Sequence, residues 1–171
     1  MKWVARVLVA ISGMLILLLV VGLLTPASHT ARTRAHFAAA PDSVWAVISA
    51  VEQWPDWSRA IHTVERLPDR EGFERWTTEA EFGNAVLEIQ IRQPPSRLQT
   101  FIDAGIFSGS WTYEVGAAGD GTQLTITETG QSGNPWLRGL MILSDKYASM
   151  IAFHEDLAVR FGESVAPERL P

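Results

Sequence analysis

The hydrophobic and polar positions of the chain follow three patterns in succession. Residues 7–24 are apolar without a charge, residues 33–130 largely alternate between apolar and polar side chains, and residues 134–161 repeat apolar side chains at three- and four-residue steps. An uninterrupted apolar run is typical of a membrane span, alternation is typical of β-strands, and the three-and-four step is typical of an amphipathic helix. We therefore expect an apolar helix, an antiparallel sheet and a C-terminal helix, in that order.

The last pattern predicts one long helix over residues 134–161. Asn134 is a favourable N-cap, Pro135 suits the first helical position, and Gly162 stands where helices usually end. At about 3.6 residues per turn, a helix of this length with one apolar face needs a large apolar partner. That face consists of Leu140, Leu143, Tyr147, Ile151, His154, Ala158 and Phe161.

Residues 1–26 are interpreted as an N-terminal membrane anchor. The uncharged run spans about 27 Å as a helix, which is close to the hydrocarbon thickness of a bilayer. Trp3 and Arg6 occupy the positions of interfacial anchors, and residues 3–24 would contact the membrane in a single pass. A cleaved signal segment is the alternative, although its apolar core is usually shorter and Thr25-Pro26-Ala27 is a poor cleavage site.

Basic residues flank both ends of the span, so they do not decide its orientation. The layout shared with secretory segments favours the extracytoplasmic side for the soluble part.

Residues 27–32 are expected to be a linker, residues 33–162 a single domain and residues 163–171 a tail. In the domain, a strand that starts at Thr33 precedes a helix opened by Ala40-Pro41-Asp42-Ser43. Because short turns join the strands that follow, these strands should be antiparallel neighbours in a meander of about seven strands. The sheet and the C-terminal helix then bury their apolar faces on each other in an α+β fold. The later strands are predicted at 61–67, 73–82, 85–93, 97–104, 110–115 and 122–130.

Composition removes several classes of function. The chain has no cysteine, which excludes disulfides, thiolate metal sites and a cysteine nucleophile. Lys2 and Arg6 are the only charges in residues 1–31, so the remainder carries twelve Lys and Arg against nineteen Asp and Glu, a net charge of −7. Such an acidic domain repels a phosphate backbone, so we expect no nucleic-acid partner. The histidines lack metal-ligand spacing, and no phosphate loop, nucleophile elbow or dinucleotide fingerprint occurs, so we expect neither a metal nor a cofactor.

Three motifs make the domain similar to the START-like superfamily, also called SRPBCC, which includes polyketide cyclases. They are the first strand running into Ala40-Pro41-Asp42-Ser43-Val44-Trp45, the break at Trp54-Pro55-Asp56-Trp57-Ser58, and the C-terminal helix. The resemblance covers residues 33–162. It implies a helix-grip fold, in which a curved antiparallel sheet wraps the long helix around an internal apolar cavity. It does not define one function, because the superfamily includes lipid carriers, hormone receptors, cyclases, toxins and chaperone activators.

Apolar residues of the strands and of the C-terminal helix are the candidate wall of that cavity. The alternative is that the same residues simply fill the core. Trp54 and Trp57 are interpreted as packing of the short helices on the rim of the sheet, with a lip at the cavity mouth or against the bilayer as the alternative. The candidate ligand-binding residues are Trp76, Phe82, Leu87, Ile89, Phe101, Phe107, Trp111, Tyr113, Leu140, Leu143, Tyr147 and Ile151.

Few polar residues are candidates for chemistry. A buried His154, near Tyr147 by helical spacing, can act as a general acid or base, or can be a core-edge histidine bonded to one carbonyl. Asp103 follows Phe101 by two residues in a predicted strand, so both should face the same side. Asp103 could then bind a ligand hydroxyl, or could simply end the strand near Gly105.

These patterns favour a membrane-tethered domain that binds or carries a hydrophobic, lipid-like small molecule and has no catalytic role. One alternative is an enzyme of the polyketide cyclase or dehydratase kind that uses His154, Tyr147 or Asp103. It requires these side chains to converge within about 3 Å of a common point. The other alternative is an envelope interaction module with a filled core and no ligand.

Overall fold

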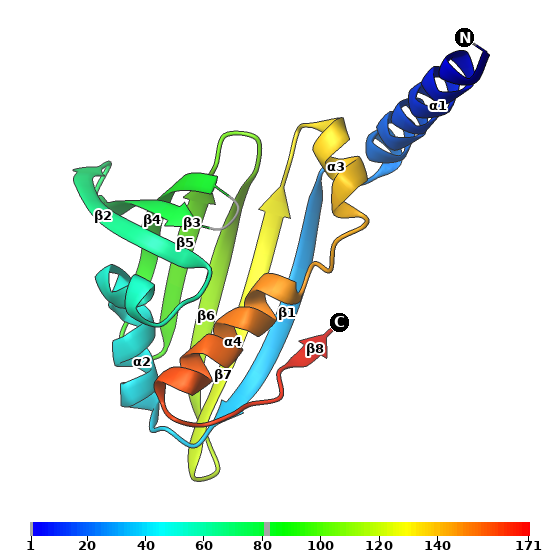
Figure 1. Cartoon of the computed structure of the whole chain (residues 1–171). Coiled ribbons are helices and arrows are strands. Elements are labelled where there is room, and N and C mark those ends of the chain that lie inside the picture. Colours follow the sequence, from blue (N-terminus) through cyan, green and yellow to red (C-terminus); the bar gives the residue numbers. More distant parts are fainter. Residues whose placement is uncertain (1, 81–82) are drawn as a thin grey trace.

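The computed structural model of the chain describes residues 2–80 and 83–171, which form an N-terminal helix, one sheet and the helices packed on either of them (Figure 1). The elements in chain order are α1 (Lys2–Leu24), β1 (Ser28–Phe37), α2 (Pro41–Ser49), the 3-10 helix η1 (Val51–Asp56), β2 (Ile61–Arg70), β3 (Phe73–Ala80), β4 (Gly83–Gln93), β5 (Arg97–Asp103), β6 (Ser108–Ala118), β7 (Gly121–Gln131), α3 (Pro135–Met141), α4 (Ala148–Arg160) and β8 (Glu168–Leu170).

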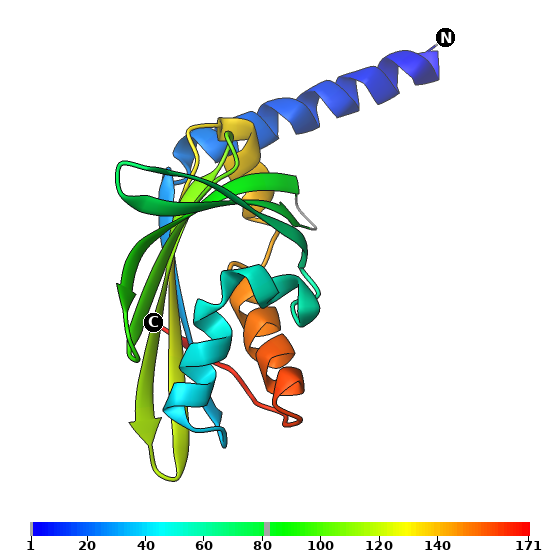
Figure 2. The same ribbon diagram turned by 90° about the vertical axis from the view of Figure 1, so that its left-hand side faces the viewer.

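The strands form one antiparallel sheet in the order β2-β3-β4-β5-β6-β7-β1-β8. The sheet is strongly curved, and α2, η1 and α4 lie on its concave side (Figure 2). This arrangement confirms the α+β helix-grip fold expected from the resemblance. The sheet has eight strands because β8, in the expected tail, pairs with β1 between Arg32–Leu170 and Arg34–Glu168. Strand β1 begins at Ser28, which pairs with Gln131, so residues 28–31 belong to the sheet and not to a linker.

The core lies between the concave face and the helices. Alternate residues of the central strands are buried there, as the period of two in a strand requires. Val44 and Ile48 of α2, and Met150 and Leu157 of α4, pack against them from the other side. The fully or almost fully buried strand residues include Ala31, Thr33, Ala35, Phe37, Leu87, Leu98, Thr100, Tyr113, Leu124 and Ile126.

The single long helix predicted over residues 134–161 is wrong, because the chain forms two helices. Asn134 caps α3 as predicted, its Oδ1 accepting from the backbone N–H of Trp136 at 2.9 Å. The helix stops at Met141, whose carbonyl accepts from the Ser144 hydroxyl at 2.8 Å, and Asp145 Oδ1 accepts from the Tyr147 N–H at 3.0 Å. Short polar side chains that bond nearby backbone groups compete with helical hydrogen bonds, and these bonds stabilise the turn over 142–147.

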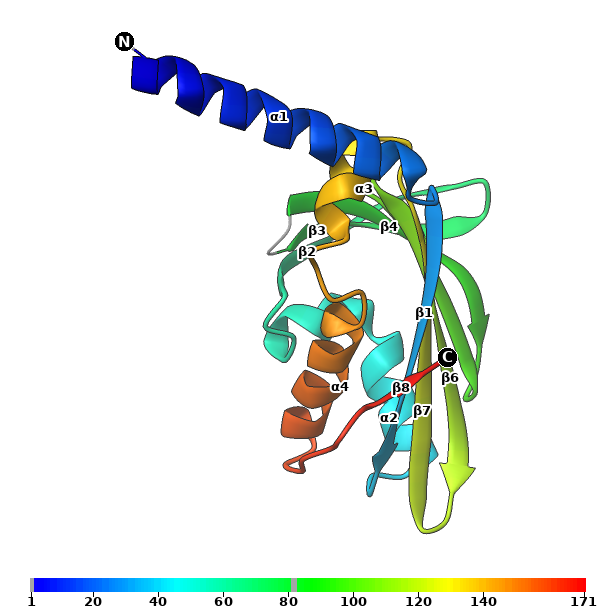
Figure 3. The same ribbon diagram turned by 90° about the vertical axis from the view of Figure 1, so that its right-hand side faces the viewer.

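Helix α3 packs on α1 and not on the sheet (Figure 3). Gly22 and Gly139 allow the close approach, because a Cβ at Gly22 would lie 1.7 Å from the Pro135 carbonyl oxygen and one at Gly139 would lie 2.5 Å from that of Leu18. The Arg138 Nε also donates to the Gly22 carbonyl at 2.8 Å. Gly22 is the only buried residue of α1, which by length and composition is a candidate membrane span. A signal sequence near an N-terminus has the same properties.

One buried carboxylate connects helix α4 to the segment between η1 and β2. The Asp156 side chain is 3% exposed and accepts from both the backbone N–H, at 2.8 Å, and the Nε of Arg59. The neighbouring Glu155 is 51% exposed and lies 3.6 Å from the same guanidinium. The two carboxylates therefore offer a matched comparison of a buried and an exposed partner for one arginine.

We expect Asp156→Ala to lower the free energy of unfolding by about 1–3 kcal/mol, because a backbone donor loses its partner in a partly buried site. Glu155→Ala should change it by less than about 0.5 kcal/mol, as exposed ion pairs contribute little. Urea unfolding of the full chain in detergent micelles, followed by circular dichroism, measures both. Equal effects of the two substitutions would contradict the role given to Asp156.

Candidate functional site

The lower part of the concave face, meaning the part farther from α1, is filled by an aromatic cluster between the sheet and α4. Phe153 of α4 stands at its centre, with ring centroids 5.0 Å from Trp57 and 5.3 Å from Tyr113. Trp54 is buried and donates its indole N–H to the Ile48 carbonyl at 3.1 Å, which anchors η1. Trp54 and Trp57 thus take the packing role predicted for them. The cluster comprises Trp54, Trp57, Trp111, Tyr113 and Phe153.

Above this cluster, the concave face carries apolar side chains that remain partly exposed. Ile102 pairs with the buried Leu87 and so faces inward, yet Ile102 is only half-buried. Phe107 is also half-buried, and its ring lies over the small residues of β6 and β7, since a Cβ at Gly130 would come within 2.9 Å of it. Trp111 bridges this surface and the cluster below. We call Ile102, Phe107 and Trp111 the upper concave surface.

A buried acid lies beside the upper concave surface. Glu128 of β7 is 8% exposed, with its Oε1 3.3 Å from His29 Nε2 on β1. The Ser149 hydroxyl of α4 lies 3.5 Å from the other carboxylate oxygen. Burial raises the pKa of Glu128, and the His29, Trp111 and Ser149 side chains partly offset this effect. The pair Glu128–His29 therefore offers a proton donor or acceptor on an otherwise apolar surface.

His154 is buried one level below Glu128, on the apolar face of α4 where the helical spacing predicted it. Its Nε2 lies 3.1 Å from the Thr33 hydroxyl, and its Nδ1 finds no partner among the residues that the structure describes. Burial lowers the pKa of His154 to about 4, so the ring is neutral at neutral pH. The alternative to an acid or base role was a core-edge histidine bonded to one carbonyl. The partner of His154 is instead a strand hydroxyl.

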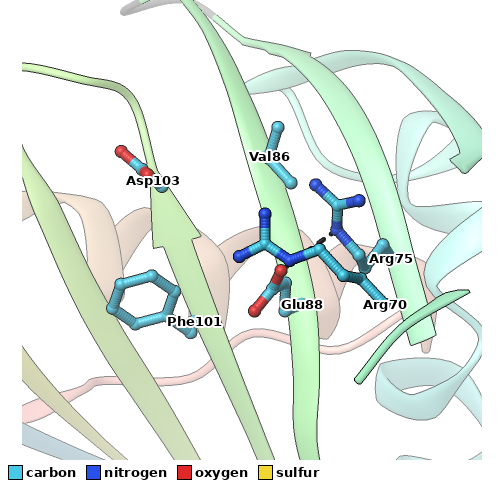
Figure 4. A pocket seen from close by; sticks show the side chains of 6 residues that line it. All are labelled: Arg70, Arg75, Val86, Glu88, Phe101 and Asp103. Atoms are coloured by element: carbon cyan, nitrogen blue, oxygen red, sulfur yellow. Dashed lines mark ion pairs between the residues drawn. The ribbon is translucent and has the colours of Figure 1, made fainter. Parts of the chain in front are cut away.

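Asp103 and Phe101 share one side of β5, as predicted, but it is the convex side. The inward positions of this strand belong to Leu98 and Thr100, which are completely buried. Asp103 accepts from the Gly105 N–H at 2.8 Å near the strand end. A depression of about 100 Å³ lies on this face. Figure 4 shows the side chains that line it, which are Arg70, Arg75, Val86, Glu88, Phe101 and Asp103.

The convergence required for a His154, Tyr147 and Asp103 catalytic set is absent. Asp103 is on the far side of the sheet from His154, as the alternation of β5 requires. The ring of Tyr147 lies at the edge of the helical layer, beneath the charged groups of Lys146 and Arg169 at 5.1 and 5.2 Å. The set of three converging side chains that the cyclase alternative requires is therefore not assembled.

The remaining candidate wall residues lie in several different places. Trp76, Leu87, Ile89 and Tyr113 are buried on the concave face, and Ile151 is half-buried on α4. Leu140 and Leu143 are exposed on α3 and the following turn, because the helix break carries them away from the sheet. Phe82 lies outside the described residues.

A second hollow of about 450 Å³ opens at the strand edge and is lined by Arg34, Ala35, His36, Gln123, Ser164, Val165, Ala166 and Glu168.

Sequence reasoning missed Glu128 and His29. A signal for Glu128 exists, because it continues the inward series Leu124 and Ile126 by a step of two. Among the described residues, no group of three or more acidic or histidine side chains is placed to hold a metal ion.

His154 should make stability depend on pH. Its pKa of about 4 in the folded protein is below its ordinary 6.5, so protonation favours the unfolded chain. This contribution is complete above pH 6.5 and is lost as the pH falls toward 4, by up to about 3 kcal/mol. We expect chemical unfolding of His154→Gln in micelles to show a flatter pH dependence over this window. The exposed His62→Gln should keep the wild-type slope, and an unchanged slope in His154→Gln would refute the assignment.

Similar solved structures share the fold at low sequence identity. The Zhui aromatase/cyclase from Streptomyces sp. R1128 has a TM-score of 0.64 at 15% identity, over 76% of this chain and 91% of that one. The di-domain ARO/CYC StfQ from the steffimycin biosynthetic pathway has a TM-score of 0.64 at 9% identity, over 79% and 52%. A START superfamily protein from Mycobacterium smegmatis has a TM-score of 0.58 at 15% identity, over 77% and 96%.

The sequence comparison adds the family to the fold. No curated protein matches the chain. The family described as polyketide cyclase/dehydrase and lipid transport matches residues 28–144, which is more than half of the chain and reaches from β1 through α3. The chain therefore belongs to this family, within the START-like superfamily.

Proposed function

We propose that the protein is a membrane-tethered domain that binds or carries a hydrophobic, lipid-like small molecule. The bound molecule lies against the upper concave surface, next to Glu128. Helix α1 remains uncleaved as the anchor, and the domain stands on the extracytoplasmic side. The family supports binding of a hydrophobic ligand, and the long exposed apolar helix supports the tether.

The observation that carries the proposal is the difference between the two halves of the concave face. Below, aromatic rings pack on one another and leave little apolar surface to cover. Above, Ile102, Phe107 and Trp111 face the helical side and still retain exposed surface. Covering such surface contributes about 25 cal/mol for each Å² removed from water. A ligand with an apolar body and one polar group fits this surface and the Glu128–His29 pair.

The tether adds to this affinity without adding a contact. Only residues 25–27 separate α1 from β1, so the binding surface stays within a short distance of the bilayer. A short connection of this kind raises the effective concentration of a membrane-resident ligand to roughly millimolar values. A carrier of weak intrinsic affinity would therefore be loaded while it remains tethered.

Adjacent residues of β5 provide the test. Ile102→Gln places an amide on the upper concave surface and should weaken ligand retention about tenfold, through lost apolar burial. Phe101→Gln makes a comparable change on the convex face and should leave retention unchanged. Native mass spectrometry of the full chain, released from micelles after purification and after addition of lipid mixtures, measures bound ligand. A wild-type chain that carries no apolar ligand under either condition would instead favour an interaction module without a ligand.

Cyclase or dehydratase activity is the second candidate function, and the Glu128–His29 pair favours it. An acid with a raised pKa retains its proton to higher pH and can protonate a ketone oxygen while a neighbouring base removes a proton. On this reading, incubation with a linear poly-β-ketone thioester should give cyclised product with loss of water, detected by mass spectrometry. Glu128→Gln should slow that reaction at least about a hundredfold while binding of the thioester persists. The binding proposal predicts no conversion by either protein.

A further inference from the structure

Helix α3 and the turn that follows it expose a cluster of large apolar side chains. Trp136 is 41% exposed, Leu140 53%, Ile142 54% and Leu143 82%. We call these four residues the α3 apolar face. Soluble proteins rarely leave a contiguous apolar patch uncovered without a partner. Helix α3 makes its close contact with α1 through Gly139, which is buried, whereas these four side chains remain exposed beside that contact.

The sheet dictates where this face lies relative to α1. Strands β1 and β7 pair antiparallel to their ends, with Ser28 opposite Gln131, and the Ser132 N–H continues the pairing by donating to the Ala27 carbonyl at 2.9 Å. The chain entering β1 and the chain leaving β7 therefore stand side by side. Helix α3 consequently begins next to the end of α1, where the Gly22 and Gly139 contact holds it.

The depth of this contact suits the surface of a membrane. Gly139 touches Leu18, which lies about 1.7 turns, or about 9 Å, from the end of α1 at Leu24. An interfacial helix buries its apolar side about 5–10 Å into the boundary between headgroups and acyl chains. With α1 across a bilayer, α3 would lie at that boundary, where an indole such as that of Trp136 is favoured.

Charge points to a zwitterionic surface. The only basic residue of α3, Arg138, has its Nε on the Gly22 carbonyl, and the domain beyond residue 31 carries a net charge of −7. An acidic domain gains nothing from anionic lipid. The contact therefore depends on apolar burial.

We propose that the α3 apolar face is a second membrane contact, seated in the headgroup layer of a zwitterionic bilayer beside α1. The inference rests on the tether of the proposed function, because the packing of α3 on α1 is what selects lipid as the occupant. It also places the entrance of the binding surface. The Ser132 hydroxyl donates to the Ile106 carbonyl at 2.8 Å, which ties the loop carrying Ile106 and Phe107 to the start of α3. A lipid can then reach Phe107 from the bilayer without crossing water.

The cysteine-free chain allows a direct measurement of depth. Single cysteines carrying nitroxide labels are placed in the full chain at Leu143, at Val159 and at Met14, and each protein is put into phosphatidylcholine nanodiscs with one chain per disc. Val159 is the matched control, because it is also an apolar residue and 75% exposed, but lies on α4. Met14, in the middle of α1, reports whether the anchor crosses the bilayer. Collision rates with oxygen and with a water-soluble nickel chelate measure lipid and water access.

We expect the label at 143 to collide with the nickel chelate several-fold less often than the label at 159, and with oxygen more often. This difference should persist at high salt, since it does not depend on charge. Equal water access at 143 and 159, with the label at 14 shielded in lipid, would overturn the inference and leave the tether intact. Water access at 14 as well would instead show that the tether of the proposed function fails.

Discussion

The full-length antiparallel pairing of β1 with β7 is the constraint on which the rest of the structure depends. These strands lie next to each other although almost the whole domain separates them in sequence, and their register brings Ser28 opposite Gln131 and Phe37 opposite Thr122. One end of the pair receives α1 and releases α3, and the other end leads from Phe37 into α2. The same pairing closes the meander, so the apolar alternation of six strands becomes one concave surface that the helices must cover.

Covering that surface divides its chemistry into two levels. Where α2, η1 and α4 all contribute, aromatic rings and a neutral His154 complete a dry core. Where the helix breaks, cover is partial and polar groups appear, with Glu128, His29 and Ser149 supplied by β7, β1 and α4. Burial at this depth disfavours the charged carboxylate of Glu128, and so it raises the pKa of this group. The polar groups of the concave side therefore gather where the helices cover the sheet only in part.

Local signals predicted most of the elements because they depend on neighbouring residues. The strands predicted at 110–115 and 122–130 form the β6–β7 hairpin, in which Gly119 takes the left-handed conformation at φ 60° and Gly121 pairs with Ala118. The asparagine cap, the proline starts and the strand alternation behaved in the same way. Strand β8 was missed because three residues at an edge carry too short a pattern to distinguish from a loop.

The site was harder to predict because it depends on pairing between distant strands. In β5 either side of the alternation has an apolar member, and only the pairing of Ile102 with Leu87 shows that Phe101 points outward. Glu128 could have been placed inward by its step from Ile126, but its partner His29 lay in a segment expected to be a linker. The inward position of the acid was therefore predictable, and its pairing was not.

The break of the C-terminal helix follows from a competition between two apolar partners. The spacing of Leu140 and Leu143 relative to Tyr147 and Ile151 fits one continuous helix, and that spacing says nothing about which surface each half contacts. The sheet is available to α4, while Gly139 brings α3 onto α1 at a separation that larger residues would prevent. A straight helix cannot satisfy both contacts, so the polar residues from Ser144 to Lys146 form a turn between them. One continuous helical pattern thus divides into two helices with different packing partners: α4 packs on the protein core, and α3 packs on α1.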